Sequence, residues 1–336
     1  MRQILGVTLP FFALVLCGYL AAQRRLLPGS AIPGLNAFVL FFALPCMLFR
    51  FGQSTPLLQL LNPAVLGVYL IAALLIVFFT IAVTLSPRLG LRDAAFGALV
   101  AAFPNSGFMG VPLLVAVLGQ AAAGPVICTI LADMLVTSSL CLGLAQAGGA
   151  GGAGLAGGRA AAGRALRGAL SNPLPWSIVL GAAAGVTGLG LPGPVQAIVK
   201  MLADAASPVA LFTIGAVLWR SGDPAHRSVD VPDAALPAPA PTPLRQVAPV
   251  AAIKLLLHPL LVLLLGAAAQ TAGVPLTPFE LTALTLTAAL PSASNVSLLA
   301  ERYGADNGRV ARIILASTAL AFFSFSALAW LFDVRP

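Results

Sequence analysis

The sequence predicts an all-α integral membrane protein, and three observations carry that prediction. Hydrophobic residues make up 59% of the 336 residues and charged residues only 8%, whereas a soluble domain carries about 25% charged residues. The apolar residues gather in ten segments, each long enough to cross a bilayer, because a transmembrane helix needs about 20 apolar residues. Arginine clusters on alternate connections between these segments, which is typical of a polytopic membrane protein.

The ten segments follow one another at short intervals. We expect transmembrane helices at residues 4–22, 31–51, 63–85, 94–118, 124–145, 173–191, 196–218, 246–268, 279–300 and 309–332. Two stretches interrupt this series: a Gly/Ala-rich linker at residues 146–172 and a Pro/Ala-rich loop at residues 219–245, whose composition favours an extended connector. The longer linker divides the chain into a first five-helix repeat, residues 1–145, and a second, residues 173–336.

The positive charges predict the orientation of the chain. Thirteen arginines fall on connections that follow odd-numbered segments, against three arginines and Lys200 on the opposite side. Because cytoplasmic loops carry the excess of arginine and lysine, we expect both termini on the non-cytoplasmic side of the inner membrane. Five is an odd number of crossings, so the second repeat would enter the membrane in the reverse sense. The sequence thus predicts a 5+5 inverted-topology repeat.

The fourth and ninth segments each contain a helix-breaking sequence near the centre. Residues 103–112 read FPNSGFMGVP, and residues 290–295 read LPSASN. Proline frees backbone groups that lipid cannot satisfy, so irregular backbone at this depth persists only where it is buried in protein or lines a cavity. Interruptions at corresponding positions of two repeats point to the binding site of a secondary transporter.

Several of these sequences resemble one protein family. Residues 103–113, the run KLLLHPL at residues 254–260, and residues 289–304, which begin ALPSASN, are similar to motifs of the auxin efflux carrier family. The similarity is greatest to its bacterial branch of malate or malonate permeases. It implies a ten-helix fold shared with bile-acid symporters and sodium–proton antiporters, in which the fourth and ninth helices cross as broken segments. It further implies that a small organic anion binds beside the crossing, and that the protein forms a homodimer.

The candidate substrate site consists of residues around the two breaks, with Asn105 and Asn295 foremost. An amide side chain both donates and accepts hydrogen bonds without carrying charge. Half-helix N-termini add a partial positive charge that attracts a carboxylate. The other candidates for the lining are Pro104, Ser106, Gly107, Pro291, Ser292 and Ser294. Alternatively, the two asparagines only satisfy carbonyls that their own prolines free.

Three charged residues inside the segments are candidates for ion coupling: Asp133, Asp204 and Lys254. A carboxylate in mid-membrane is costly, so Asp133 either carries a proton or makes a structural hydrogen bond to a neighbouring helix. Lys254 either neutralises Asp133 or attracts the substrate, unless it snorkels to the interface. Asp204 can pair with Lys200 four residues earlier, and an interfacial ion pair is the alternative to a coupling role.

Two further polar residues have less specific interpretations. His258 has no second histidine or carboxylate at ligand spacing, which favours a core histidine hydrogen-bonded to a carbonyl. Arg50, at the outer end of the second segment, is either an entry charge for anions or an interface anchor.

The sequence contains no enzyme motif, such as a phosphate-binding loop with its lysine or a nucleophile elbow. The four cysteines lie inside apolar segments without metal-ligand spacing, so we expect neither a cofactor nor a metal. The basic residues lie in short loops, which argues against nucleic acid. A channel would need rings of like charge or a carbonyl filter. This sequence shows neither, so a channel is the less favoured alternative. The prediction is a secondary transporter of a small organic anion, such as malate, malonate or an auxin-like acid, that works by alternating access, coupled to protons or, alternatively, to sodium.

Overall fold

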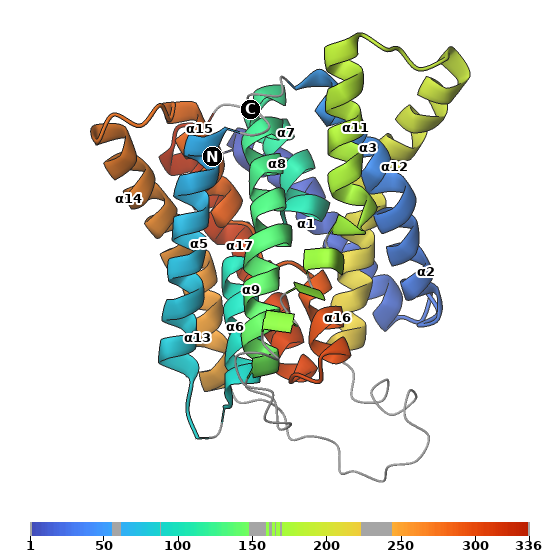
Figure 1. Ribbon diagram of the computed structural model, residues 1–336. Coiled ribbons are helices and arrows are strands. Elements are labelled where there is room, and N and C mark those ends of the chain that lie inside the picture. Colours follow the sequence, from blue (N-terminus) through green and yellow to red (C-terminus); the bar gives the residue numbers. More distant parts are fainter. Residues whose placement is uncertain are drawn as a thin grey trace.

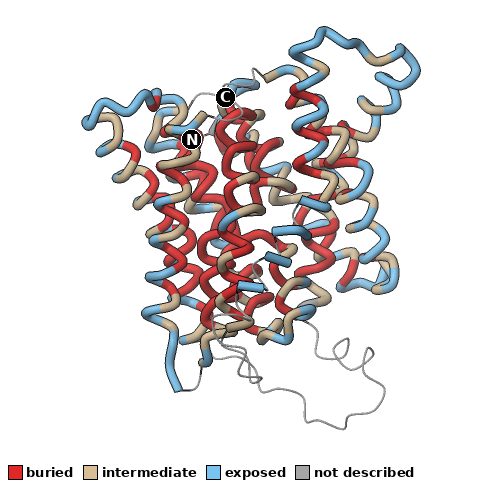
Figure 2. The backbone as a smooth tube through the Cα atoms, viewed as in Figure 1, coloured by how far each residue is buried: buried red, intermediate tan, exposed pale blue. Residues whose placement is uncertain are grey.

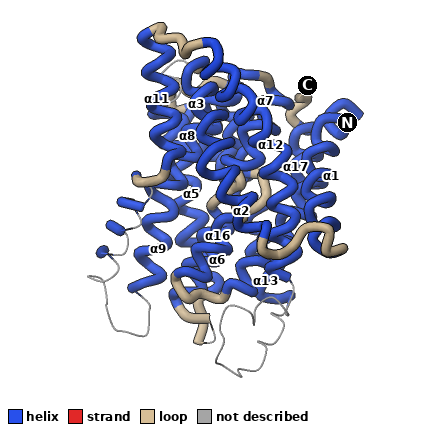
Figure 3. The backbone as a smooth tube through the Cα atoms, turned by 90° about the vertical axis from the view of Figure 1, so that its right-hand side faces the viewer, coloured by secondary structure: helices blue, strands red, loops and turns tan. Residues whose placement is uncertain are grey.

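The computed structural model describes residues 2–55, 62–87, 89–147, 159–160, 163–164, 166–168, 170–222 and 244–334. These residues form a bundle of helices, and among them no strand is present (Figures 1 and 3). Among the described residues, seven helices are long and apolar enough to cross a membrane. The linker 146–172 and the loop 219–245 lie largely outside the described residues.

The first half of the chain supplies helices and single π- or 3₁₀-helical turns. They are α1 (Arg2–Gln23), α2 (Ala31–Phe38), η1 (Val39–Ala43), α3 (Leu44–Ser54), α5 (Pro63–Thr84), α6 (Leu91–Ala102), η2 (Ser106–Gly110), α7 (Val111–Leu118), η3 (Gln120–Ala122), α8 (Ala123–Ala132), η4 (Asp133–Thr137) and α9 (Ser138–Ala147). The second half supplies α11 (Pro173–Thr187), α12 (Gly193–Gly222), α13 (Leu244–Ala252), η6 (Ile253–Leu257), α14 (His258–Thr271), α15 (Pro278–Ala288), α16 (Asn295–Arg302) and α17 (Asn307–Leu331).

Each predicted segment is helical, but the fourth and ninth are divided. The fourth consists of α6 and the η2–α7 helix, and the ninth of α15 and α16. Helix α6 ends at Ala102 because Pro104 disfavours helical backbone at the residue before it. Phe103 is accordingly extended, with φ −93° and ψ 101°. The breaks are therefore local consequences of the prolines.

Burial is concentrated in the inner helices, whereas the connection between α11 and α12 is exposed (Figure 2). In α6, every residue from Ala94 to Ala102 is buried. The outer helices expose large apolar side chains, among them Phe79, Leu180 and Phe323. An apolar outer surface of this kind suits a bilayer, because lipid tails solvate such side chains as well as a protein core does.

Glycines bring two pairs of helices into backbone contact. Where α1 meets α12, a Cβ on Gly18 would lie 1.8 Å from the carbonyl oxygen of Phe212. A Cβ on Gly215 would lie equally close, 1.8 Å, to the carbonyl oxygen of Val15. Helices α3 and α11 approach in the same way at Gly181. Small residues are the usual means by which membrane helices pack this closely.

Replacing Gly18 with alanine is expected to destabilise the protein, because the new methyl group would force α1 and α12 apart. Overpacking of this kind costs about 1–3 kcal/mol, and thermal unfolding of the purified protein would measure it. Gly6 lies on the same helix, and a Cβ there would meet nothing within 4 Å. Gly6→Ala is therefore the matched control and should not lower the unfolding temperature. Equal effects of the two substitutions would contradict the role of Gly18.

Candidate functional site

The breaks in the fourth and ninth predicted segments lie directly against each other. The backbone N–H of Asn105 donates to the carbonyl of Pro291 at 2.8 Å, and that of Ala293 donates to the carbonyl of Phe103 at 3.0 Å. These two bonds form an antiparallel bridge between Pro104 and Ser292. Each break thus satisfies backbone groups of the other, as irregular backbone at membrane depth requires.

Asn105 presents an unused hydrogen-bond acceptor in this region. The side chain is only 3% exposed, and its Oδ1 is buried without a partner among the described residues. Its backbone carbonyl, in contrast, accepts from the N–H groups of Met109 and Gly110 at 3.1 and 2.9 Å. A buried acceptor left unpaired costs about 1–3 kcal/mol, so a ligand that donates a hydrogen bond to Oδ1 would be stabilising. A carboxylate would instead accept from the Nδ2 group of the same amide.

The residues after Asn105 differ in how closely they are packed: Gly107 borders open space, whereas Gly110 packs against the ninth segment. The Ser106 hydroxyl donates back to the carbonyl of Pro104 at 3.2 Å. A Cβ on Gly107 would meet nothing within 4 Å, whereas a Cβ on Gly110 would lie 2.7 Å from Cδ1 of Leu290. Gly110 therefore allows the ninth segment to approach, and Gly107 faces open space.

The candidates in the ninth segment have different surroundings. The Ser292 hydroxyl donates to the carbonyl of Val100 at 2.7 Å, and the Ser292 backbone N–H donates to Oγ of Ser317 at 3.2 Å. Ser292 therefore ties this break to α6 and α17. Pro291 and Ser294 are buried beside it, and Asn295 is half-buried as the first residue of α16. Of the side chains predicted for the substrate site that the structure describes, Asn105 is the one with a fully buried polar atom that lacks a hydrogen-bond partner.

A second polar cluster is buried between α5, η4, η6 and α14. Asp133 has no exposed surface. One of its carboxylate oxygens accepts from the Tyr69 hydroxyl at 2.7 Å, and the other accepts from the Thr137 hydroxyl at 3.0 Å. Asp133 is thus deep in the bundle and is hydrogen-bonded to a neighbouring helix.

Lys254 belongs to the same cluster, and the expectation that it snorkels to the interface is wrong. It has no exposed surface, and its Nζ donates to the carbonyl of Ala288, the last residue of α15, at 2.9 Å. The same Nζ lies 3.2 Å from Nδ1 of His258, and the His258 ring lies 5.9 Å from the Tyr69 ring between centroids. The reason is electrostatic, since the C-terminal end of a helix carries a partial negative charge that attracts a cation.

The sequence predicts that His258 binds a backbone carbonyl, but the structure shows no such bond among the described residues. Its Nδ1 faces Lys254, and its Nε2 is buried without a partner among the described residues. A neutral imidazole with its proton on Nε2 fits the contact with Lys254, because Nδ1 can then accept from the ammonium group. Tyr69 binds Asp133 and His258 contacts Lys254, and the two aromatic rings lie beside each other. The sequence does not indicate this ring contact.

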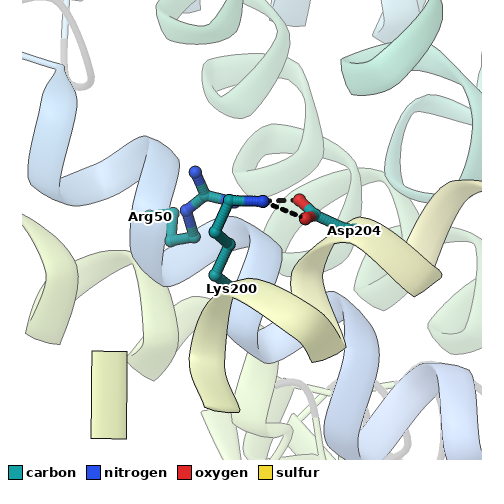
Figure 4. Close-up of polar contacts among 3 residues, drawn as sticks. All are labelled: Arg50, Lys200 and Asp204. Carbon is teal, nitrogen blue, oxygen red and sulfur yellow. Dashed lines mark hydrogen bonds and ion pairs between the residues drawn. The ribbon is translucent and has the colours of Figure 1, made fainter. Parts of the chain in front are cut away.

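The third polar region is a cavity of about 890 Å³ between α3, η3–α7 and α12. On its wall, Nη1 of Arg50 lies 3.1 Å from Oδ1 of Asp204, and Asp204 also binds Lys200 (Figure 4). The predicted pairing of Lys200 with Asp204 is confirmed. The contribution of Arg50 could not be predicted, because it comes from a different helix.

Comparisons with known proteins cover nearly the whole chain. A family model described as "Membrane transport protein" matches residues 4–329. The chain is 31% identical over 336 residues to a protein of Rhizobium meliloti (strain 1021) named "Putative malonate transporter". That alignment covers 98% of this chain and 96% of the relative. It includes both breaks, the buried cluster and the cavity.

Proposed function

Because this chain belongs to the auxin efflux carrier family of membrane transport proteins, we propose that it moves a small organic anion across the inner membrane by alternating access. The observation that carries this proposal is the meeting of the two breaks at Asn105, whose Nδ2 group can donate to a carboxylate, beside the open space at Gly107. Two helices, η2–α7 and α16, begin at these breaks. Their N-termini supply the partial positive charge that favours a carboxylate.

The substrate class we propose is a small carboxylate, with malonate as the first compound to test. The relative's name concerns malonate, and the chain aligns with it from end to end. Malate is the next candidate, and an auxin-like aromatic acid is the third.

The proposed architecture is ten membrane crossings in two inverted repeats. The glycine contacts support this architecture. The first predicted segment, α1, packs on the seventh, α12. The sixth segment, α11, packs on the second, which contains α3. A two-fold axis that exchanges the repeats would exchange these two pairs. Both termini also lie at the same end of the bundle (Figure 1), as an even number of crossings requires. The distribution of arginine supports the proposal that this end faces the non-cytoplasmic side.

We propose that the coupling ion is a proton carried by Asp133. The carboxylate is buried in a network with Tyr69 and Thr137, and buried carboxylates in transporters commonly form proton relays. Sodium is the alternative, because the carbonyls that broken helices free can coordinate a cation. A homodimer remains a proposal from the family resemblance.

The proposed function is tested with the purified full-length protein, in two assays. Thermal unfolding is measured with malonate, malate, monocarboxylates and aromatic acids, and uptake of labelled malonate is measured in proteoliposomes. Malonate at about 100 times its Kd is expected to stabilise the protein by about 2.7 kcal/mol. An imposed pH gradient is expected to drive malonate accumulation, whereas accumulation driven only by a sodium gradient would favour the alternative. If no acid stabilises the protein or accumulates, the proposal of an organic-anion carrier is wrong.

A further inference from the structure

We propose that Arg50 and Lys200 form an anion-recognition site at the cavity, and that Asp204 occupies this site as an internal carboxylate until a substrate carboxylate displaces it. The inference rests on the proposed function and deepens it. It assigns recognition of the anionic group to residues on α3 and α12, apart from the broken helices.

The contacts show how a carboxylate binds at this position. One oxygen of Asp204 lies 3.1 Å from Nη1 of Arg50, and the other oxygen lies 2.5 Å from Nζ of Lys200. The two cations thus bind the two oxygens of one carboxylate (Figure 4). A ligand carboxylate has the same shape and charge as the Asp204 side chain, so it can take the same two partners.

The site is accessible to a solute and keeps free hydrogen-bond donors. The side chains of Arg50, Lys200 and Asp204 are 44%, 62% and 53% exposed, and Arg50 and Asp204 line the cavity. The guanidinium group has five donors, and within the described residues one of them binds Asp204 and the others have no partner. A second carboxylate can therefore bind Arg50 before Asp204 leaves, which makes a stepwise exchange possible.

The charges of the cavity favour an anion. Arg50 is the one cation among the described residues that line it, and Asp204 is the one anion. With Lys200 beside Asp204, the group carries two positive charges and one negative charge. The neutral polar residues of the wall include Gln53, Gln120 and Gln196. A net positive charge in a cleft raises the local concentration of anions and their rate of association.

The cavity also adjoins the break in the fourth segment. Pro112 of α7 lines the cavity, and the same helix begins through η2 at Ser106. Helix α12, which carries Lys200 and Asp204, packs against η2. The η2–α7 helix therefore joins the wall of the cavity to the break.

A purely structural role is the competing explanation, since the ion pair also joins α3 to α12. The two explanations predict different directions for the change in malonate affinity on Asp204→Asn. If the pair only joins the helices, Arg50→Gln and Asp204→Asn remove the same interaction and act in the same direction. If the cations recognise an anion, Arg50→Gln weakens malonate binding, whereas Asp204→Asn strengthens it by removing the competing carboxylate.

The test is the KM and Vmax of malonate uptake by the full-length chain in proteoliposomes, for wild type, Arg50→Gln, Lys200→Gln and Asp204→Asn. Solvent-exposed charges act weakly, so we expect KM to rise about two- to fivefold in the first two variants and to fall by a similar factor in the third. Vmax should change little. Lys200→Arg, which keeps the charge, is the matched control and should keep the wild-type KM. The differences should shrink in 1 M salt, where the Debye length is about 3 Å.

Two results would overturn the inference. A shift of KM in the same direction for Arg50→Gln and Asp204→Asn, or no shift in either, would leave only the structural role. Wild-type protein that neither binds nor carries any of the tested acids would instead refute the proposed function, and this site with it. Uptake by wild type therefore separates the two failures.

Discussion

Replacing Asn105 with alanine is expected to remove malonate-induced stabilisation and to slow malonate uptake strongly. The Asn105 side chain is buried where the two breaks meet, and its Oδ1 has no partner among the described residues. Its Nδ2 group is the donor that a ligand carboxylate would accept from. A hydrogen bond to a charged group contributes about 1.5–3 kcal/mol, which corresponds to about a 10- to 150-fold loss of affinity. Unfolding temperatures with and without malonate, together with initial uptake rates, would measure the effect.

Two further variants distinguish ligand binding from folding at this position. Asn105→Asp keeps the shape of the side chain but adds a negative charge, and we expect it to abolish malonate binding. Ser292→Ala removes a hydroxyl that donates to the carbonyl of Val100, so it should lower stability while malonate still stabilises the protein. If Asn105→Ala keeps the full malonate response, the meeting of the breaks is structural and the assignment of the site is wrong.

Replacing Asp133 with asparagine is expected to abolish proton-driven accumulation of malonate while exchange of malonate across the membrane persists. An amide cannot carry a proton from one side of the membrane to the other. The transporter can still cross between its two conformations with malonate bound, so exchange continues. The change is isosteric, and the amide can still accept from Tyr69 and donate to the Thr137 hydroxyl. Accumulation under an imposed pH gradient and counterflow of labelled malonate would be measured in the same proteoliposomes.

Thr137→Val is the matched control for Asp133. It removes one hydrogen bond to the carboxylate but leaves the ionisable group in place, so accumulation should persist. Accumulation by Asp133→Asn equal to that of wild type would show that the proton travels elsewhere. If malonate accumulation by the wild-type protein responds only to a sodium gradient, the proton mechanism is excluded, whatever the two variants do.

The parts of the structure that follow from local chemistry could be predicted from the sequence. Pro104 and Pro291 indicated the breaks, because proline restricts its own backbone and that of the preceding residue. The spacing of Lys200 and Asp204 indicated their ion pair, because residues four apart are neighbours on a helix. The family could also be identified, since its motifs are local sequences.

The contacts between distant segments could not be predicted in the same way. Nothing in the sequence around Arg50 specifies Asp204 as its partner, because the packing of α3 against α12 brings them together. The snorkelling alternative for Lys254 failed for a related reason. The continuous helix begins at Leu244 rather than at residue 246, which places Lys254 deeper than expected, and only the fold shows that the end of α15 lies beside it.

The single π-helical turns have a further consequence for how one membrane helix serves two sets of neighbours. A π-turn adds one residue to the helical circuit, so the faces before and after it are out of phase by about 100°. Across η4, α8 packs on α5 and α15, whereas α9 packs on α6. Across η6, α13 packs on α17 and α6, whereas α14 packs on α5 and α15. The phase change occurs at the turns that carry Asp133 and Lys254. Deleting one residue from either turn would therefore rotate the half-helix that follows it, and the apolar face of that half-helix would turn away from the helices on which it packs.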